Sequence, residues 1–438
     1  MHALESLIVD FQDRPLPDLT PRDLVLPSLA GKADVLVGMR RSGKTYTLYQ
    51  EMKRLVQAGV DRRHMLYLNF EDDRLLPLTP AILSDALEAF YRLDPSARET
   101  DSYLFFDEIQ AVPGWPRFLR RVLDTERVRV YVTGSSAKFL STEVATEFRG
   151  RGLAIEILPF SFRESARHAG IDMPTGVPPA RLRSKLEARF RRFLEVGGFP
   201  EAQDVEEPDR IQMLQDYVEL VLLRDIIERY GIGNIAAVRE FARSLLQSSA
   251  AQFSVHKTYN DLKSRGVDVG KDTLYALLEH LQDAFLIFTV PVFRKSLRAR
   301  QTKPKKAYAI DPGLAFAMSH VLAEDIGSRL ETAVYLELRR RARGSRDGAI
   351  SYYVTSAGHE VDFVLGDPSE DHASRLVQVC ADMSSPETRD REVRALDAAM
   401  NELGLRESTV VTMFEDATIE VEHGRIDVVP GWKWMLLG

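Results

Sequence analysis

Between residues 21 and 160, short apolar runs alternate with longer stretches that have helical spacing. A short run rich in branched apolar residues and bounded by polar ones is typical of a buried strand, whereas Thr47 to Ala58 has the spacing of an amphipathic helix. Strands that alternate with helices predict a parallel sheet covered on both faces. The predicted strands are Ala33 to Val37, His64 to Phe70, Ser102 to Phe106 and Val128 to Thr133.

The pattern changes after residue 160. Residues 161–235 are predicted to be mainly helical, and a glycine-rich joint at Gly197 to Pro200 separates two amphipathic stretches. Residues 236–290 predict three short helices and a hairpin, in the order of a winged helix. Residues 307–438 return to a mixed α/β pattern that includes a long helix from Arg329 to Arg341. The predicted parts are an arm (1–20), an α/β core (21–160), a helical part (161–235), a winged-helix-like part (236–306) and a second α/β domain (307–438).

Composition excludes several classes of protein. The chain has 438 residues, which suggests about three domains. Its 45% hydrophobic and 28% charged residues are ordinary for a globular protein, so a disordered chain is excluded. No apolar stretch is long enough to span a bilayer, and the single Cys380 excludes a disulfide framework. We therefore expect a cytoplasmic protein without membrane contact. The net charge of -7 argues against coating nucleic acid uniformly, although a local basic groove remains compatible with it.

A glycine-rich turn follows the first predicted strand and precedes the first predicted helix. Residues 38–45 fit the pattern G-x-x-x-x-G-K-[ST] in the strand–turn–helix context that it requires. The glycines allow a tight turn whose amide groups face phosphates, and the helix N-terminus adds positive partial charge. Lys44 is expected to reach the β- and γ-phosphates of ATP, and Thr45 to offer a hydroxyl to Mg²⁺. The predicted nucleotide ligands are Gly38, Arg41, Ser42, Gly43, Lys44, Thr45 and, from the next motif, Asp107.

The third predicted strand ends in two adjacent carboxylates, Asp107 and Glu108, which we call the acidic pair. Asp107 is expected to hold Mg²⁺ together with Thr45. Glu108 is expected to polarise the attacking water as a general base. In isolation an acidic strand end is common on protein surfaces, but after a phosphate-binding loop the pair favours hydrolysis over nucleotide storage.

Two further segments offer groups that could stabilise phosphoryl transfer. The fourth strand runs into Thr133-Gly134-Ser135-Ser136, where a hydroxyl either positions the water or caps the next helix, and Ser135 is the preferred candidate. Beyond it, Arg149 and Arg151 flank Gly150. An arginine here stabilises the transferring phosphoryl group in cis or in trans, or both arginines belong to a surface turn.

Together these segments resemble the AAA-type P-loop ATPases of the prokaryotic class that carries a C-terminal domain of unknown function. The resemblance implies an ATPase core, an α-helical lid, a winged-helix-like middle and an endonuclease-like C-terminal α/β domain. It also implies a hexameric or similar ring, and it favours Arg151 as the finger because relatives usually place Gly-Arg there. Besides the motifs above, the matching stretches are residues 69–72, 104–110, 158–162, 197–201 and 305–314.

Residues 291–306, here called the basic segment, reverse the overall charge of the chain. They contain seven basic residues and no acidic one: Arg294, Lys295, Arg298, Arg300, Lys303, Lys305 and Lys306. Basic side chains bind phosphates and release counterions, so this segment beside a winged-helix-like part predicts sequence-independent DNA contact. A solvated linker with no partner is the alternative.

The C-terminal domain has an incomplete endonuclease pattern. Glu331 lies on the predicted helix, and Glu360 and Asp362 begin a predicted strand, as such a metal site requires. Gln378 and Cys380, however, stand where a carboxylate and a lysine are needed. A neutral amide and a thiol support magnesium chemistry poorly. Three functions therefore stay open: first an ATP-driven DNA motor, then an ATP-dependent switch that recruits a protein, and last a nuclease.

Overall fold

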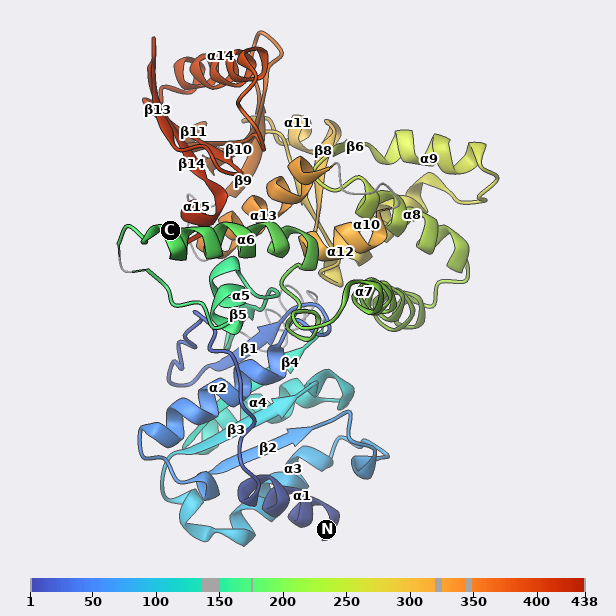
Figure 1. Cartoon of the computed structure of the whole chain (residues 1–438). Helices are drawn as coiled ribbons and strands as arrows, with labels where there is room; N and C mark the ends of the chain where they lie inside the picture. The colour runs from blue at the N-terminus through green and yellow to red at the C-terminus, as the bar shows by residue number, and fades with distance from the viewer. Residues whose placement is uncertain (1, 136–149, 175, 320–324, 343–348, 437–438) are drawn as a thin grey trace. The chain divides into compact units, whose positions relative to one another are not determined.

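The computed structural model describes residues 2–135, 150–174, 176–319, 325–342 and 349–436. Contacts divide the chain into two compact units. One contains residues 1–158 with 283–285, and the other contains residues 159–282 and 286–438. The first unit ends near the boundary expected at residue 160, whereas the three parts expected beyond it lie together in the second. Figure 1 shows the elements in chain order.

A five-stranded parallel sheet forms the centre of the first unit. Its order is β2-β3-β4-β1-β5, and every neighbouring pair is parallel. The predicted parallel α/β sheet is thus confirmed, with one edge strand added after the four expected from the sequence. The strands are β1 (Ala33–Val37), β2 (Met65–Asn69), β3 (Ser102–Asp107), β4 (Val128–Gly134) and β5 (Gly152–Glu156).

Helices pack on both faces of this sheet because successive strand residues point to opposite sides. Phe105 stacks on Tyr131 in a core that α2 supplies with Leu48. Its neighbour Phe106 faces the other way and meets Phe118 of α4 edge-on. The helices are α2 (Lys44–Gln57), α3 (Ile82–Leu93) and α4 (Trp115–Thr125), with short 3-10 turns η1 (Arg62–His64), η2 (Asp73–Leu75), η3 (Pro95–Arg98) and η4 (Ile109–Ala111).

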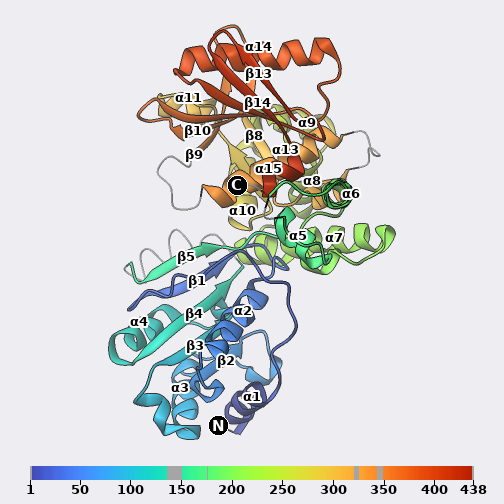
Figure 2. The same cartoon turned by 60° about the vertical axis from the view of Figure 1, so that its left-hand side comes forward.

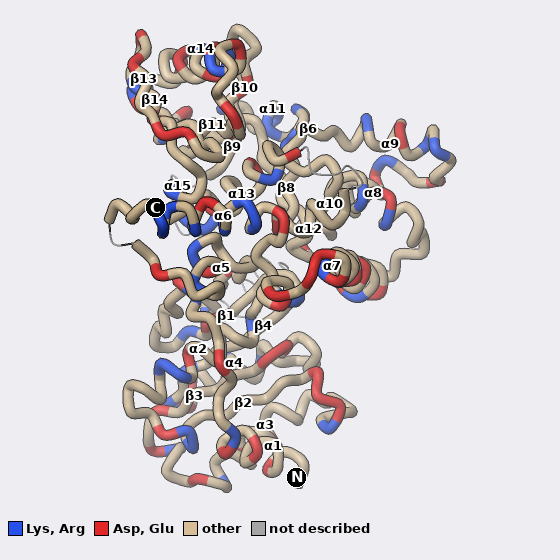
Figure 3. The backbone as a smooth tube through the Cα atoms, viewed as in Figure 1, with Lys and Arg blue, Asp and Glu red and all other residues tan. Residues whose placement is uncertain are grey.

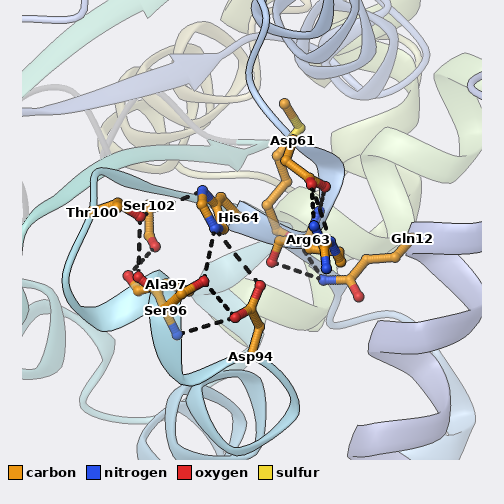
Figure 4. Close-up of polar contacts among 10 residues, drawn as sticks. Gln12, Asp61, Arg63, His64, Asp94, Ser96, Ala97, Thr100 and Ser102 are labelled. Carbon is orange, nitrogen blue, oxygen red and sulfur yellow. Dashed lines mark hydrogen bonds and ion pairs between the residues drawn. The ribbon is translucent and has the colours of Figure 1, made fainter.

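The segment expected to be an arm contains a helix, α1 (His2–Asp13). Leu4, Ile8 and Phe11 are buried and share one face, since residues three and four apart are neighbours on a helix. Gln12 donates from Nε2 to the carbonyl of Met65, which ties α1 to β2 (Figure 4). The sequence analysis did not predict this helix, because polar residues lie between the apolar positions.

Figure 4 also shows the polar contacts at the amino end of β2. Ser96 and Asp94 both approach His64 at Nε2, at 3.4 and 3.7 Å. A catalytic triad needs the serine and the carboxylate on different ring nitrogens, so this cluster lacks that geometry. Asp94 instead accepts from the backbone N–H of Ser96 and caps η3.

The second unit begins with the helices expected from the sequence. These are α5 (Phe162–His168), α6 (Ala180–Val196) and α7 (Glu207–Val221), with the 3-10 turn η6 (Pro200–Ala202) between the last two. A π-helical stretch, Leu222–Glu228, continues α7. Arg224 in this stretch is exposed and pairs with Glu228, four residues further on, at 3.1 Å, as is common for an arginine on the surface of a helix.

The middle of this unit has four helices and a small antiparallel sheet. Its order along the chain is helix, strand, two helices, strand, helix and strand, and the strands pair as β6-β8-β7. Three helices before the antiparallel pair β7–β8 agree with the predicted order, whereas α11 between these two strands was not expected, and the winged-helix-like part stays a prediction. The elements are α8 (Ile235–Gln247), β6 (Gln252–Phe253), α9 (Val255–Ser264), α10 (Lys271–Asp283), β7 (Ile287–Val290), α11 (Leu297–Thr302) and β8 (Lys305–Ala309).

A six-stranded mixed sheet of order β13-β14-β12-β11-β10-β9 forms the C-terminal part. Leu396 and Met400 of α14 enter its core, and Figure 2 shows this helix along the sheet. This separate α/β domain confirms the fold class expected there. The elements are α12 (Pro312–Met318), α13 (Ile326–Arg341), β9 (Ala349–Val354), β10 (Glu360–Asp367), β11 (His372–Val379), α14 (Pro386–Leu403), β12 (Glu407–Thr412), β13 (Ala417–Val421), β14 (Gly424–Pro430) and α15 (Gly431–Leu436).

Candidate nucleotide-binding site

The phosphate-binding loop connects β1 to the start of α2, as its sequence predicts. Gly38 packs so closely that a Cβ atom there would lie 2.2 Å from the carbonyl oxygen of Ile157, so only glycine fits. Gly43 has a φ of 100° and caps α2. Lys44 is buried, and its Nζ donates to the carbonyls of Gly38 and Met39 at 3.1 and 3.2 Å. The loop is therefore preformed, with its cation turned back onto it.

Residues outside the loop hold it in place. Arg22 donates from Nη1 to the carbonyl of Ser42 at 3.1 Å, although the sequence gave no reason to single it out. Arg40 pairs with Glu71, just beyond β2, at 2.8 Å. The hydroxyl of Ser42 is buried without a hydrogen-bond partner in the described part of the chain. A buried polar atom of this kind, inside a phosphate-binding pattern, fits a site that a nucleotide completes.

The acidic pair lies at the end of β3, beside this loop. Thr45 donates from Oγ1 to Oδ2 of Asp107 at 2.7 Å, so the two predicted Mg²⁺ ligands are adjacent. Glu108 lies 3.7 Å from Lys44, measured from Oε1 to Nζ. Tyr67 donates a hydrogen bond to Asp107 at 3.2 Å. The structure thus brings together Lys44, Thr45, Asp107 and Glu108 from two motifs.

Burial and charge make this site favour a cation. Burial raises the pKa of Asp107, and the neighbouring Glu108 carboxylate raises it further, while hydrogen bonds from Thr133 and Thr45 oppose the rise. A buried carboxylate is costly to ionise alone, and a divalent ion would reverse that cost. The donor set of hydroxyl and carboxylate oxygens is the type that Mg²⁺ prefers.

The hydroxyl that contacts the acidic pair is that of Thr133. It donates to Oδ1 of Asp107 and accepts from the backbone N–H of Glu108. Ser135, the candidate preferred from sequence, is buried two residues further on. The parallel register of β3 and β4 pairs Phe106 with Val132, so the next residues, Asp107 and Thr133, are neighbours. The register of β3 and β4, which the structure supplies, is what identifies Thr133.

Arg151 lies at the amino ends of the strands β1 and β5, whereas the phosphate-binding loop follows the carboxyl end of β1. Its carbonyl accepts from Ala33, the first residue of β1, whereas the loop follows the last residue of that strand. The two ends of β1 are about 16 Å apart, which is the length of a five-residue strand. Its guanidinium pairs with Asp124. Arg151 therefore does not reach the nucleotide site of its own chain, which removes the cis alternative. Arg149 lies outside the described residues.

The basic segment surrounds α11, as Figure 3 shows by its blue residues. Lys295, Arg298 and Lys303 are exposed, and Arg300 and Lys305 are half-buried. Arg294 is exposed but donates to the carbonyl of Val354 at 2.9 Å. Six of the seven basic residues thus remain at the surface, and the segment joins β7 to β8.

Lys306, the last residue of this set, requires a correction. Its side chain is only 3% exposed, and its Nζ lies 2.7–2.8 Å from carboxylate oxygens of Glu331, Glu360 and Asp362. Alternation along β8 turns it inward, away from its neighbour Lys305. A lysine surrounded by three carboxylates is not available to DNA phosphates, so Lys306 leaves the predicted DNA-binding set.

The same cluster clarifies the incomplete pattern of the C-terminal domain. Gln378 accepts from the N–H of Asp362 and donates to Glu392 at 2.8 Å, which is a structural role. Burial raises the pKa of the Cys380 thiol to about 11, so it is a weak nucleophile. Lys306 already neutralises charge among Glu331, Glu360 and Asp362, and nothing in the described residues supports the endonuclease-like character expected of this domain.

Three of the stretches that resemble the AAA-type ATPases contact one another in the second unit, through Phe160, Gly198 and Asp311. A Cβ atom on Gly198 would lie 2.2 Å from the carbonyl oxygen of Phe160, and the backbone N–H of Gly198 donates to Asp311 at 2.6 Å. Asp311 also caps α12 through the N–H of Leu314. Glycine is needed here for close packing, which favours a fixed helix break over the hinge that such a glycine pair could also form.

Comparison with known families matches two stretches of the chain. The family described as AAA domain matches residues 30–166, and a domain of unknown function matches residues 187–325. The uncharacterized protein MJ1544 of Methanocaldococcus jannaschii is 32% identical over 422 residues, which cover 95% of this chain and 90% of the relative. An uncharacterized protein of Haemophilus influenzae is 28% identical over 75% of this chain and 78% of its own length.

Solved structures show weaker likeness. The Aeropyrum pernix ORC1 protein, solved in complex with DNA, covers 69% of this chain and 94% of its own, with 16% identity and a TM-score of 0.28. The Cdc6p protein of Pyrobaculum aerophilum covers 66% of this chain and 86% of its own, with 13% identity and a TM-score of 0.24. Scores this low carry no functional argument. Among the described helices, none has the length and apolar character needed to cross a bilayer.

Proposed function

The chain belongs to the same family as the uncharacterized protein MJ1544 of M. jannaschii and matches the AAA domain over residues 30–166, and we propose that it is a Mg²⁺-dependent ATPase that works on DNA as an oligomer. The observation that carries the ATPase proposal is the meeting of Lys44, Thr45, Asp107 and Glu108 at the carboxyl ends of β1 and β3. Ligands of parallel α/β sheets bind at this edge.

Each residue has a distinct part in the proposed reaction. Lys44 leaves the loop carbonyls and binds the terminal phosphates, while the loop amides hold the rest of the chain of phosphates. Thr45 and Asp107 would hold Mg²⁺, which would supply positive charge against the phosphates when bound. Glu108 takes a proton from the attacking water, and Thr133 fixes the backbone of the acidic pair while it does so.

The proposal of DNA as partner rests on the basic segment. Its six surface cations lie next to a winged-helix-like part, in a chain whose net charge is -7. A local concentration of this kind binds phosphates without reading sequence. Coupling hydrolysis to this contact would make the assembly a helicase or branch-migration type of motor. The protein-recruiting switch is the second candidate, because α11 would serve a protein partner equally well. Active cleavage is disfavoured by the neutral Gln378 and by Lys306 inside the acidic cluster.

The test is the rate of ATP hydrolysis, measured with and without duplex, single-stranded and branched DNA. Lys44→Ala should weaken nucleotide binding because it removes a phosphate cation. Glu108→Gln should retain nucleotide binding and lose turnover by about 10²–10⁴-fold, because only proton transfer is impaired.

The three functions predict different outcomes. A motor gives turnover that rises with at least one form of DNA, and a switch gives slow turnover indifferent to DNA. If Glu108→Gln hydrolyses ATP at the wild-type rate, the assignment of the base is wrong. Magnesium-dependent cutting of any of the three DNAs would bring back the nuclease.

A further inference from the structure

Gln110 lies two residues beyond Glu108, on the short turn η4, and has no part in the reaction described so far. Its Nε2 donates to Oε2 of Glu108 at 2.5 Å. A carboxylate only accepts hydrogen bonds, so this contact fixes which end of the Gln110 amide faces Glu108. The other end, Oε1, must then point away from the carboxylate.

That oxygen is buried and has no hydrogen-bond partner in the part of the chain that the structure describes. Buried acceptors are nearly always satisfied, because leaving one without a donor costs free energy. An exception next to a candidate general base therefore indicates that a donor arrives with the substrates. Among the substrates of hydrolysis, the attacking water is the donor that must come next to Glu108.

The backbone holds both side chains in a fixed relation. Glu108 has a φ of 52°, in the left-handed region that glutamate rarely adopts. Its N–H donates to Oγ1 of Thr133 at 2.9 Å, and the N–H of Ala111 closes η4 on the Glu108 carbonyl. Such strain persists where the surrounding structure fixes it, and it is concentrated at functional sites. The turn thus holds Glu108 and Gln110 in hydrogen-bond contact, with Oε1 of Gln110 next to the candidate base.

We propose that Gln110 is a catalytic residue that positions the attacking water. Glu108 takes one proton of this water, and Oε1 of Gln110 accepts a hydrogen bond from the other. The water oxygen forms the new bond to the γ-phosphorus, and the bond from that phosphorus to the bridging oxygen breaks, leaving its electron pair on ADP. The proton on Glu108 then passes to the released phosphate. This inference rests on the proposed ATP hydrolysis and adds to it the residue that orients the nucleophile.

The test compares Gln110→Ala and Gln110→Glu with the wild type, in the full chain. Gln110→Ala should lower kcat by about tenfold to hundredfold, because a misplaced nucleophile loses much of its reactivity. Its affinity for ATP should be unchanged, and its melting temperature should not fall, since the substitution removes an unsatisfied acceptor. The matched control is Gln57→Ala at the exposed end of α2, which should keep the wild-type kcat.

Gln110→Glu adds a variant of nearly the same size. It loses the N–H that holds the amide against Glu108, so kcat should fall while the affinity for ATP stays at the wild-type value, a split that general damage to the site would not give. A Gln110→Ala variant within twofold of the wild-type kcat, or the loss of ATP binding in either variant, would overturn the inference. If Glu108→Gln is inactive in the same assay, the proposed ATPase survives that result. If the wild type itself hydrolyses no ATP, the proposed function fails and takes this inference with it.

Discussion

Lys306 lies buried among carboxylates from two other elements, α13 and β10. Three carboxylates surround its ammonium group, so the cluster carries an excess of negative charge when all of them are ionised. Tyr308 also donates to Glu331 at 2.7 Å. Buried groups of like charge cannot all ionise cheaply, and the protein responds by keeping a proton on one of them. Burial raises the pKa of Glu331, so Glu331 is the carboxyl expected to keep that proton.

This arrangement predicts how stability depends on pH. Burial and the neighbouring Asp362 raise the pKa of Glu331 to about 8, from an ordinary value of 4.5. Because the folded state holds the proton more tightly, this stabilisation is complete below pH 4.5 and is lost as the pH rises to about 8. The slope is at most about 1.4 kcal/mol per pH unit. Melting temperatures should fall across this window in the wild type and fall less in Glu331→Gln.

The control for this measurement is Glu370→Gln, an exposed carboxylate in the turn between β10 and β11. It should reproduce the wild-type curve at every pH. Parallel curves for the wild type and Glu331→Gln would show that Glu331 titrates normally and that the excess charge is balanced elsewhere.

Among the helices and strands, the hydrophobic periodicity of the sequence predicted the elements that form from local sequence pattern. Four of the five parallel strands, the long helices α6 and α13, and the order of elements in the middle part follow from it. Strand β5 was missed because Gly152-Leu-Ala-Ile-Glu is short and gains its stability by pairing with β1. Lys306 was assigned to the surface because neighbouring charges in a sequence look alike, whereas a strand turns alternate residues inward. Thr133 required the register of β3 against β4, which spacing along the sequence does not reveal, and Gln110 required the geometry of the turn that it shares with Glu108.

The basic segment is the element whose predicted role is easiest to measure. Replacing Arg298, Arg300 and Lys303 with alanine should weaken DNA binding, because fewer phosphates are neutralised. The slope of log affinity against log salt should flatten by about two to three units. ATP hydrolysis without DNA should be unchanged, since the nucleotide site lies in the first unit. Fluorescence anisotropy over a salt series measures the affinity and the slope together.

A charge-matched control is available on α6. Arg181, Lys185 and Arg192 are exposed there, and their triple alanine variant removes the same charge from another surface. It should leave most of the affinity and the slope intact. Equal losses in both variants would mean that DNA responds only to net charge. No loss in the first variant would move the proposal to the protein-recruiting switch.

The proposed reaction uses an arginine finger, and the candidate Arg151 does not lie at the nucleotide site of its own chain. The nucleotide site has a cation in Lys44, a metal-binding pair and a base, but its candidate finger Arg151 lies at the far edge of the sheet. The amino end of the sheet in one subunit could meet the carboxyl end in the next through a head-to-tail contact, and such contacts form a ring when the rotation closes. The position of Arg151 is compatible with a finger that acts in trans, which we propose as the arrangement to test.

Mixing two inactive variants tests this arrangement directly. Glu108→Gln lacks the base and Arg151→Ala lacks the finger, and each alone should lose at least about tenfold in kcat, with 10³–10⁵-fold the usual range for a finger. In a mixed assembly, some interfaces pair an intact Glu108 with an intact Arg151 from the neighbour, so activity should return in proportion to those interfaces. Arg127→Ala, which removes another arginine near the amino edge, is the control and should retain activity alone. If both variants assemble with each other and no ratio restores hydrolysis, Arg151 is not a trans finger, and its pairing with Asp124 is its whole role.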